Sequence, residues 1–230
     1  MNVEILHRVE GAKKATGCAV IIDVFRACTV EGYLALNGAQ RVIPVADMQV
    51  AYDMKAADPS VVLIGERHGV ILPGFDYGNS PSQIENVDFG GKTVVHTTSA
   101  GTQGMENATN ADEILLGSLA GADAVARYVK ARGFAHVSLV CMGWEALKET
   151  EEDNLCARYI KDLLLGASTD YIAEEIEGLK ATAGAKFFDP AQHDVFPEKD
   201  FFLCTELGRF DFVMKINKTS ALPFVEKIRV

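Results

Sequence analysis

The clearest indication of the fold comes from residues 61–81, VVLIGERHGVILPGFDYGNSP. The apolar run Val61–Ile64 is typical of a buried strand. At its end the run changes abruptly to Gly65-Glu66-Arg67, which places two charges beside a core where unpaired charge is costly. The rest of the stretch is rich in glycine, proline and short polar residues, a composition typical of shaped loops that carry binding groups. We therefore expect a buried strand that ends in a functional loop.

Similar apolar runs recur before and after this stretch. They cover residues 19–22, 42–45, 93–96, 114–116 and 137–141. Helical patterns lie between them, at about 29–37, 47–58, from 101 onward, and 123–132. Strands that alternate with helices in this way predict an α/β fold, with a largely parallel sheet flanked by helices.

Beyond about residue 145 the pattern becomes more helical. Helices are expected at about 149–165, 171–179 and 198–207, followed by a strand at 210–216. The sequence contains no long linker, internal repeat or low-complexity segment. We therefore expect a single domain over residues 1–230, in which a more helical C-terminal part packs against the sheet. Two subdomains with a boundary near residue 145 are the alternative.

Composition and charge narrow the range of partners. The 230 residues carry a net charge of −10, which argues against nucleic acids and anionic membranes. The amino terminus lacks the features of a signal peptide, and the five cysteines show no paired spacing, so we expect a cytoplasmic protein with reduced, buried thiols. An anionic substrate would need local positive charge or a metal ion at its site. A homo-oligomer is left open.

Polar residues gather where three of the expected strands end. Asp23 and Arg26 follow the run 19–22, Glu66 and Arg67 follow the run 61–64, and a Thr/Ser-rich segment follows the run 93–96. Ligands of open α/β sheets bind at the carboxyl ends of the strands. If the three strands are parallel, the three groups meet at one edge of the sheet.

These groups suit an anionic substrate and a metal ion. Asp23, Glu66 and Asp76 are carboxylates of the kind that Mg²⁺ takes as ligands. The guanidinium groups of Arg26 and Arg67 match the oxygens of phosphate or sulfonate. Hydroxyl and amide side chains suited to positioning such a group are Asn79, Ser80, Thr97, Thr98, Ser99 and Thr102.

Each of these residues also has an ordinary structural interpretation. Asp23 is a suitable cap for the helix expected after it. Glu66 and Arg67 are suited to a structural ion pair, and a Ser/Thr run is typical of a turn. Taken singly, each residue favours its structural interpretation. Their repeated position at strand ends favours a functional site.

An acidic run, Glu149–Asp153, begins the longest expected helix, where negative charge is favourable. Helical spacing places Asp153 on the apolar stripe continued by Cys156, Ala157, Ile160 and Leu164. Asp153 is therefore the carboxylate expected to point inward. Glu151 is expected to be exposed and Glu152 intermediate.

Together these motifs resemble those of the 2-phosphosulfolactate phosphatase family. The matching stretches are IDVFRA (22–27), GER (65–67), GFDYGNSP (74–81), TTSAGT (97–102) and Glu152-Asp153. Their order and spacing also match, so the resemblance covers nearly the whole chain, and the GFDYGNSP element is the most specific. Two departures are Arg158, where relatives often have glycine, and Phe212-Val213-Met214, where they often have Val-Pro.

The resemblance implies a Mg²⁺-dependent phosphatase that hydrolyses (2R)-2-phospho-3-sulfolactate to 3-sulfolactate and phosphate, a step toward coenzyme M. Catalytic roles then fall to Asp23, Arg26, Glu66, Arg67 and Asp153. The metal ligands would come from Asp23, Glu66, Asp76 and Asp153. Asp23 and Asp153 are alternatives for the base that orients water, and covalent attack by Asp23 is a further alternative.

Two other functions are consistent with the same residues. One is a non-catalytic protein that binds small anions. The other is a metal-dependent hydrolase of another small phosphorylated acid. Magnesium-dependent release of phosphate distinguishes catalysis from binding alone.

Overall fold

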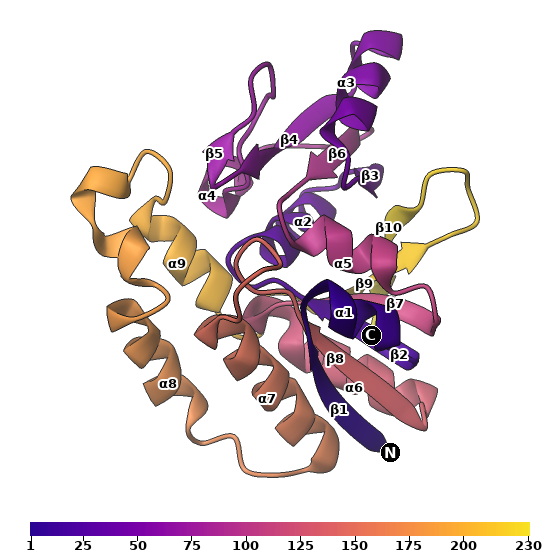
Figure 1. Cartoon of the computed structure of the whole chain (residues 1–230), viewed down its shortest axis with the longest axis vertical. Coiled ribbons are helices and arrows are strands. Elements are labelled where there is room, and N and C mark those ends of the chain that lie inside the picture. Colours follow the sequence, from indigo (N-terminus) through magenta and orange to yellow (C-terminus); the bar gives the residue numbers. More distant parts are fainter.

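A ten-stranded sheet covered by helices on both faces organises the chain, in a computed structural model that describes all of residues 1–230 (Figure 1). The strands are β1 Asn2–His7, β2 Gly17–Ile22, β3 Arg41–Pro44, β4 Val62–Arg67, β5 Val70–Ile71, β6 Thr93–Thr97, β7 Ala111–Gly117, β8 His136–Cys141, β9 Phe212–Asn217 and β10 Phe224–Arg229. The α-helices are α1 Arg8–Lys14, α2 Ala27–Leu36, α3 Met48–Ala57, α4 Pro81–Ile84, α5 Gly101–Asn107, α6 Ala122–Arg132, α7 Glu151–Leu165, α8 Ile172–Gly178 and α9 Glu198–Thr205. The predicted α/β fold with a largely parallel sheet is confirmed.

The sheet consists of two parallel sets joined by an antiparallel ribbon. The strand order is β1-β8-β2-β7-β9-β10-β3-β6-β4-β5. Strands β1, β8, β2 and β7 are parallel to one another, as are β3, β6 and β4. Strands β9 and β10 lie between the sets and pair antiparallel with each other and with both neighbours. Three antiparallel pairings therefore separate β2 from β6 and β4, so β2 runs antiparallel to both. The sequence had suggested that these three strands are parallel, which is wrong for β2.

Strand β2 is buried on both faces, which explains its continuous apolar sequence. Its side chains alternate between two cores. Cys18, Val20 and Ile22 belong to the core covered by α6 and α7, whereas Ala19 and Ile21 belong to the core beneath α1, α2 and α5. A third, smaller core surrounds β3, β4 and α3. The strand that leads to Asp23 is thus fixed from both sides.

The helix ends follow the signals in the sequence. Asp47 caps α3, because its side chain accepts a hydrogen bond from the Gln49 N–H at 2.9 Å. Helices α6 and α7 end at Gly133 and Gly166, which have φ of 69° and 71°, in the left-handed region that favours glycine. These features confirm the helices expected between the apolar runs.

The C-terminal part combines helices with two strands of the common sheet. Helices α7, α8 and α9 lie along one side of the sheet in Figure 1, and α7 packs against α6. Strands β9 and β10 then return to the sheet between β7 and β3. The two parts of the chain on either side of residue 145 therefore share one sheet.

Several elements were not expected from the sequence. These are β1, α1, the short β5 and α4, and β10. Strand β4 also continues through Glu66 and Arg67, so that both charges lie within the strand rather than after it. All five cysteines are buried and free, as expected. No helix is both long enough and apolar enough to cross a membrane.

Gly65 sits where β4 and β6 approach each other most closely, beside the site described below. A Cβ at this position would lie 2.2 Å from the Thr97 carbonyl oxygen and 3.2 Å from the Phe75 ring. We expect Gly65→Ala to lower the free energy of unfolding by about 1–3 kcal/mol, because the backbone must shift. Chemical denaturation measures this. Gly178→Ala is the matched control, since no atom lies within 4 Å of its Cβ, and an equal loss in both variants would contradict the steric explanation.

Candidate active site

The loops that follow four strands, two from each parallel set, enclose a small pocket. It has a volume of about 40 Å³ and lies after β2, β4, β6 and β8; we call it the central pocket. Its lining residues are Asp23, Phe25, Arg26, Glu66, His68, Gly69, Asn79, Thr98, Ser99, Ala100, Gly143, Trp144, Glu145 and Phe196. A contact of 2.5 Å between His68 Nδ1 and Glu145 Oε1 joins two of these loops. The volume admits roughly one or two water molecules.

Asp23 faces the central pocket directly after β2 and is only 7% exposed. Its Oδ1 accepts a hydrogen bond from the Ala27 N–H at 3.1 Å, at the start of α2. Burial raises the pKa of Asp23 from 3.8 to about 6; the Ala27 N–H opposes this rise and the charge of Glu66 adds to it. Asp23 therefore stabilises the helix start and also presents a carboxyl group that titrates near neutral pH.

Glu66 joins the loop after β6 to the turn after β4. Its Oε1 accepts a hydrogen bond from the Ser99 N–H at 2.7 Å. Its Oε2 accepts bonds from the Gly69 N–H at 2.7 Å and from the Ser99 hydroxyl at 3.3 Å. Because it is 6% exposed and lines the pocket, Glu66 fixes two pocket walls while adding a second carboxylate.

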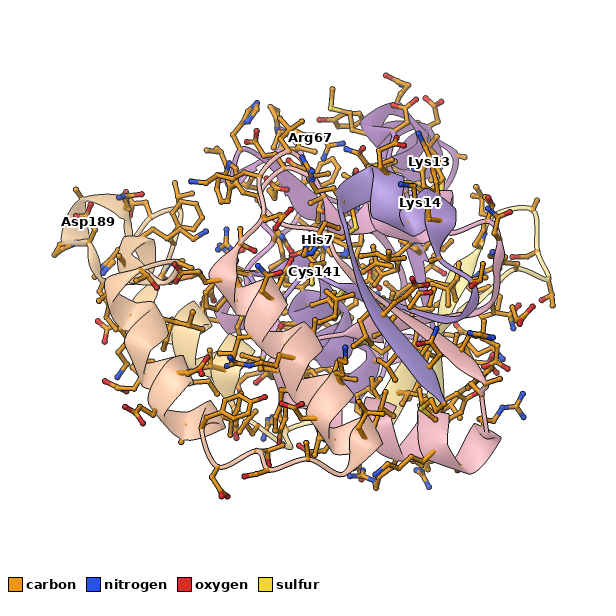
Figure 2. All side chains as sticks on the ribbon, turned by 60° about the horizontal axis from the view of Figure 1, so that its bottom comes forward. His7, Lys13, Lys14, Arg67, Cys141 and Asp189 are labelled. Carbon is orange, nitrogen blue, oxygen red and sulfur yellow. The ribbon has the colours of Figure 1, made fainter.

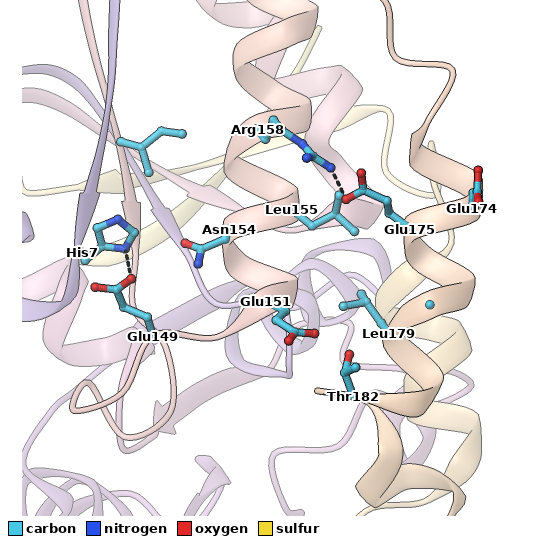
Figure 3. A pocket seen from close by; sticks show the side chains of 12 residues that line it. His7, Glu149, Glu151, Asn154, Leu155, Arg158, Glu174, Glu175, Leu179 and Thr182 are labelled. Atoms are coloured by element: carbon cyan, nitrogen blue, oxygen red, sulfur yellow. Dashed lines mark hydrogen bonds and ion pairs between the residues drawn. The ribbon is translucent and has the colours of Figure 1, made fainter.

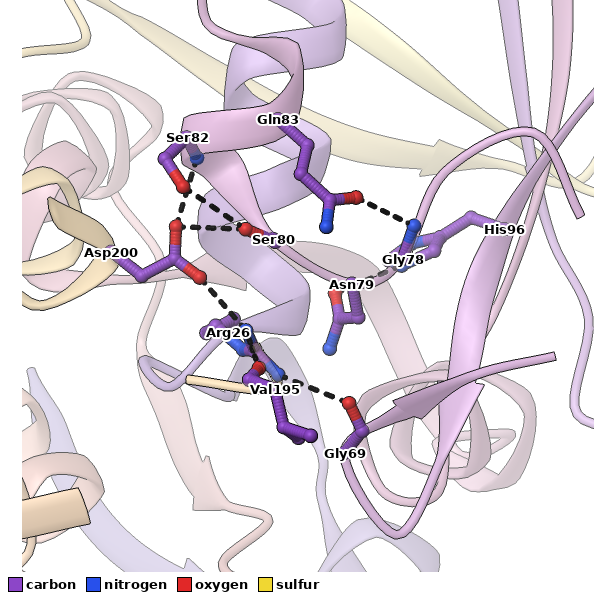
Figure 4. Close-up of polar contacts among 10 residues, drawn as sticks. All are labelled: Arg26, Gly69, Gly78, Asn79, Ser80, Ser82, Gln83, His96, Val195 and Asp200. Carbon is purple, nitrogen blue, oxygen red and sulfur yellow. Dashed lines mark hydrogen bonds and ion pairs between the residues drawn. The ribbon is translucent and has the colours of Figure 1, made fainter. Parts of the chain in front are cut away.

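Arg26 is held by a buried ion pair with Asp200, a residue that the sequence did not single out (Figure 4). The Nη1 to Oδ2 distance is 2.8 Å, and Nη1 also donates to the Val195 carbonyl at 2.9 Å. The other oxygen of Asp200 accepts bonds from the Ser80 hydroxyl and the Ser82 N–H, both at 2.9 Å. Asp200 thus fixes both the arginine and the loop that precedes α4.

Asn79 is oriented by a buried chain of hydrogen bonds. His96 Nε2 donates to Asn79 Oδ1 at 3.2 Å, and His96 Nδ1 lies 2.9 Å from Glu31 Oε1. Because the amide oxygen is engaged by His96, the amide nitrogen is free to face the pocket; in Figure 4 it points toward the space between Arg26 and Gly69. His96 itself is fully buried and acts on the pocket only through Asn79.

Asp153 points inward, as its helical position predicted, but it binds backbone. Its Oδ1 accepts from the Val24 N–H at 2.9 Å and its Oδ2 from the Gly143 N–H at 2.8 Å. It therefore links the loops after β2 and β8 and does not line the central pocket. Glu152 differs from the expectation of intermediate exposure: it is 4% exposed, and its buried Oε2 has no hydrogen-bond partner.

Arg67 and Thr97 lie outside the central pocket. Strand alternation points Arg67 away from Glu66, and no ion pair joins the two. Its guanidinium donates to the carbonyls of Glu66 and Ala46 at 2.6 and 3.0 Å and to the Thr97 hydroxyl at 3.0 Å. Arg67, which is labelled in Figure 2, lines a neighbouring depression of about 440 Å³. The two predicted arginines therefore do not meet in one pocket.

Three other predicted site residues have local partners elsewhere. Asp76 Oδ2 accepts a hydrogen bond from the Leu63 N–H at 2.8 Å and lies 3.2 Å from Lys55 Nζ, near the amino end of β4. Thr102 donates to the Thr98 carbonyl within the first turn of α5. Ser80 bonds to Asp200, as described above. The structure brings none of the three to the pocket wall.

The donor groups allow a test of the predicted metal site. No three carboxylate, imidazole or thiol side chains are placed to hold one metal ion together. The predicted set of four carboxylates therefore does not fit, because Asp76 is remote and Asp153 does not line the central pocket. Asp23 and Glu66 do line one pocket. Mg²⁺ at phosphate sites takes one or two carboxylates together with substrate and water, so this pair fits such an ion.

A larger, open groove of about 910 Å³ runs between α7, α8 and β1 (Figure 3). Four of its charged or titratable residues lie in pairs: Arg158 with Glu175, and His7 with Glu149 at 3.7 Å. The others, Glu151 and Glu174, are acidic and form no ion pair. Arg158, the departure noted in the sequence, thus lies in this groove and not at the central pocket. The groove lacks the convergence of strand ends that forms the central pocket.

Comparison with known proteins decides the family. The model of the family described as 2-phosphosulpholactate phosphatase matches residues 4–219. This chain belongs to that family. The match spans both parallel strand sets and every loop of the central pocket. The predicted enzyme class, a phosphatase, is confirmed by this membership.

Curated members of the 2-phosphosulpholactate phosphatase family match over most of their length. A protein of Bacillus subtilis strain 168 is 29% identical over 211 residues, covering 91% of each chain. One of Caldicellulosiruptor saccharolyticus is 37% identical over 77% of this chain and 74% of its own. One of Gloeobacter violaceus is 32% identical over 85% and 80%. Each is named a probable 2-phosphosulfolactate phosphatase.

Sequence reasoning missed several residues that build the pocket. Asp200 and Glu31 act as buried partners of Arg26 and His96. Phe196 and Glu145 form part of the wall. None of these belongs to a local motif, and their contacts span long distances along the chain. Trp144, which also lines the pocket, carries one usable signal, because it lies just after the end of β8.

Proposed function

We propose that this chain hydrolyses the phosphate ester of 2-phospho-3-sulfolactate in the central pocket, with Mg²⁺ as cofactor. The observation that carries the proposal is the meeting of Asp23, Arg26 and Glu66 at one pocket, although they come from different strand sets. The names of the relatives support the choice of substrate. Bound Mg²⁺ would supply charge neutralisation and Lewis acidity at the phosphoryl oxygens, and Asp23 and Glu66 are the residues suited to hold it.

The residues of the chain provide binding and proton transfer. Arg26, held in place by Asp200, presents a fixed guanidinium to phosphate oxygens. The Asn79 amide nitrogen and the Thr98 hydroxyl add neutral donors on the same wall. These donors neutralise and orient the phosphoryl group for in-line attack, which is the main requirement of phosphoryl transfer.

Asp23 is the group that accepts the proton of the attacking water. The oxygen of water forms a bond to phosphorus, and the bond between phosphorus and the ester oxygen breaks. The alkoxide product takes up a proton from solvent, to which Asp23 returns the proton that it accepted. The Asp23 carboxylate lines the central pocket, which places it within reach of a water molecule that attacks the phosphoryl group there. Direct attack by Asp23 is the alternative, and trapping of an acyl phosphate tests it.

Substrate entry requires the pocket to widen. The present volume of about 40 Å³ is smaller than a phosphorylated three-carbon acid. The contact between His68 and Glu145 crosses the pocket margin, and His68 is largely exposed there. Separation of these two side chains would join the central pocket to the depressions on either side, which share His68.

Metal removal tests the proposal most simply. We expect phosphate release from 2-phospho-3-sulfolactate by the purified protein in Mg²⁺, loss of that release after chelation by EDTA, and its recovery when Mg²⁺ is added back. Colorimetric phosphate detection measures it. Full activity in EDTA would contradict the metal requirement. Binding of the substrate without release of phosphate would instead favour an anion-binding protein.

A further inference from the structure

Lys186 is a cation beside the central pocket that neither the sequence motifs nor the proposed chemistry uses. It lies in a short 3₁₀ helix, residues Ala185–Phe188, between α8 and α9. Its Nζ is 4.3 Å from the centre of the Trp144 ring and 5.0 Å from that of Phe196. The rings of Phe187 and Phe25 are 5.6 and 6.0 Å away. Four aromatic rings therefore surround this ammonium group.

The ammonium group has no anionic partner in contact. No carboxylate lies within 4 Å of Nζ, whereas Lys55, Lys180 and Lys199 all form ion pairs. Desolvation lowers the pKa of Lys186, and the positive charge of Arg26 lowers it further. The negative charges of Glu152 and Asp23 raise this pKa, but by less than the desolvation lowers it. Lys186 is partly buried, and an ammonium group that has lost part of its hydration is costly unless an anion offsets its charge.

The position of Lys186 relates it directly to the central pocket. It lines a depression of about 660 Å³ that shares His68, Trp144 and Phe196 with that pocket. The Phe196 ring lies 5.0 Å from the guanidinium carbon of Arg26 and 5.0 Å from Lys186 Nζ. The two cations thus share one aromatic wall, with Arg26 in the central pocket and Lys186 in the depression beside it.

We propose that Lys186 and the Trp144 ring form a second anion subsite, which binds an acid group of the substrate other than its phosphate. This inference rests on the proposed function and names the substrate class, a small phosphate ester with a further sulfonate or carboxylate. Phosphate binds near Arg26, and the second acid reaches past Phe196 to Lys186. The substrate then brings a negative charge to Lys186, which has no carboxylate partner, whereas Arg26 already pairs with Asp200. A simple phosphate monoester does not reach both cations.

The subsite also accounts for how a chain of net charge −10 accepts a substrate with several negative charges. Glu152, with its unpartnered Oε2, lines the same depression and bounds the subsite on one side. The Arg67 side chain, which the sequence suggested together with Arg26 for phosphate or sulfonate oxygens, is engaged by backbone carbonyls and Thr97. Lys186 is therefore the cation available to a second acid group.

Calorimetric binding of 3-sulfolactate, lactate and inorganic phosphate to wild type, Lys186→Met and Lys186→Arg tests the subsite. We expect Lys186→Met to weaken 3-sulfolactate binding by about 10- to 100-fold and to change phosphate binding by less than about threefold. Lys186→Arg should recover part of the lost 3-sulfolactate binding. Weaker lactate binding in Lys186→Met would show that the subsite binds the carboxylate. Unchanged lactate binding would show that it binds the sulfonate. Lys180→Met is the matched control, since Lys180 lies over Phe202 but pairs with Glu177 and lines neither depression nor pocket.

These binding measurements test the second anion subsite independently of whether the protein hydrolyses the substrate. Equal binding of 3-sulfolactate by wild type and Lys186→Met, or equal weakening of 3-sulfolactate and phosphate, would overturn the subsite. Failure of the wild type to bind 3-sulfolactate would also overturn it. Differential binding without any phosphate release would retain the subsite but remove the proposed catalysis. Thermal unfolding of both Lys186 variants checks that the fold is intact, and Lys186→Arg carries the comparison if Lys186→Met does not fold.

Discussion

Asp23→Asn is expected to abolish turnover and leave the protein folded. Asparagine keeps the Oδ1 atom that accepts the Ala27 N–H, so the start of α2 is preserved. It cannot accept a proton or contribute negative charge in the central pocket. Loss of such a group typically lowers the rate by about 10²- to 10⁴-fold. The measurement is steady-state phosphate release under saturating substrate and Mg²⁺.

The same substitution is expected to stabilise the metal-free protein at neutral pH. Burial raises the pKa of Asp23 from 3.8 to about 6, so the folded state disfavours the charged form. The stability that this group contributes is present below pH 4 and is lost as pH rises through 6. The difference between these two pKa values corresponds to a loss of about 3 kcal/mol in the free energy of unfolding once the pH is above 6. Asp23→Asn should therefore be more stable than wild type at pH 7.5 and nearly equal at pH 4, as measured by denaturation in EDTA.

Asp76→Asn provides the comparison for both effects. Asp76 matches the family motif equally well but lies near the amino end of β4, where Lys55 and the Leu63 N–H engage it. We expect this variant to retain most of its activity. Normal turnover in Asp23→Asn would remove Asp23 from the mechanism. Inactivity of both variants would restore the predicted four-carboxylate site.

Asp200→Asn is expected to destabilise the protein strongly and to reduce activity. The substitution leaves the Arg26 guanidinium buried opposite a neutral amide, while the bonds from Ser80 and Ser82 to the remaining oxygen can persist. Removing one partner of a buried ion pair typically costs about 3–5 kcal/mol. Urea-induced unfolding measures the loss, and kcat/KM measures the accompanying release of Arg26 from its catalytic position.

A surface pair supplies the control for this effect. Arg158 and Glu175 also form an ion pair, but both side chains are more than 40% exposed. Glu175→Gln should change the free energy of unfolding by less than about 1 kcal/mol. If Asp200→Asn proves as mild as Glu175→Gln, the ion pair with Arg26 does not anchor the central pocket as described.

The sequence predicted the strand ends of the site because the strands themselves are strongly apolar. Strands β2, β4 and β6 are buried and contain runs of apolar residues such as Val, Ile and Leu. Asp23, Glu66 and Thr98 lie just after these runs. Five of the residues predicted from these ends do meet in the central pocket: Asp23, Arg26, Glu66, Thr98 and Ser99. The reason given for the meeting was wrong, however, because three antiparallel pairings separate β2 from β6 and β4, so that β2 runs antiparallel to them.

Long-range contacts explain most of what the sequence did not predict. Asp200 looks like an ordinary charge in the first turn of α9, and its burial depends on Arg26, 174 residues earlier. Lys186 occurs in a short 3₁₀ helix with no periodic pattern. Arg67 was assigned to the site by adjacency to Glu66, yet adjacent residues on a strand point to opposite faces. Family motifs therefore located the loops more reliably than they assigned individual side chains.

The central claim is that a phosphate group binds in the central pocket between Asp23, Arg26 and Glu66. Its most direct test is a crystal structure with Mg²⁺ and tungstate, a phosphate mimic whose tungsten atom is located by anomalous scattering. The account predicts tungsten in the central pocket, with oxygens in hydrogen-bond contact with Arg26 and Asn79. Tungsten beside Arg67 or in the groove beside Arg158, with none in the central pocket, would contradict it.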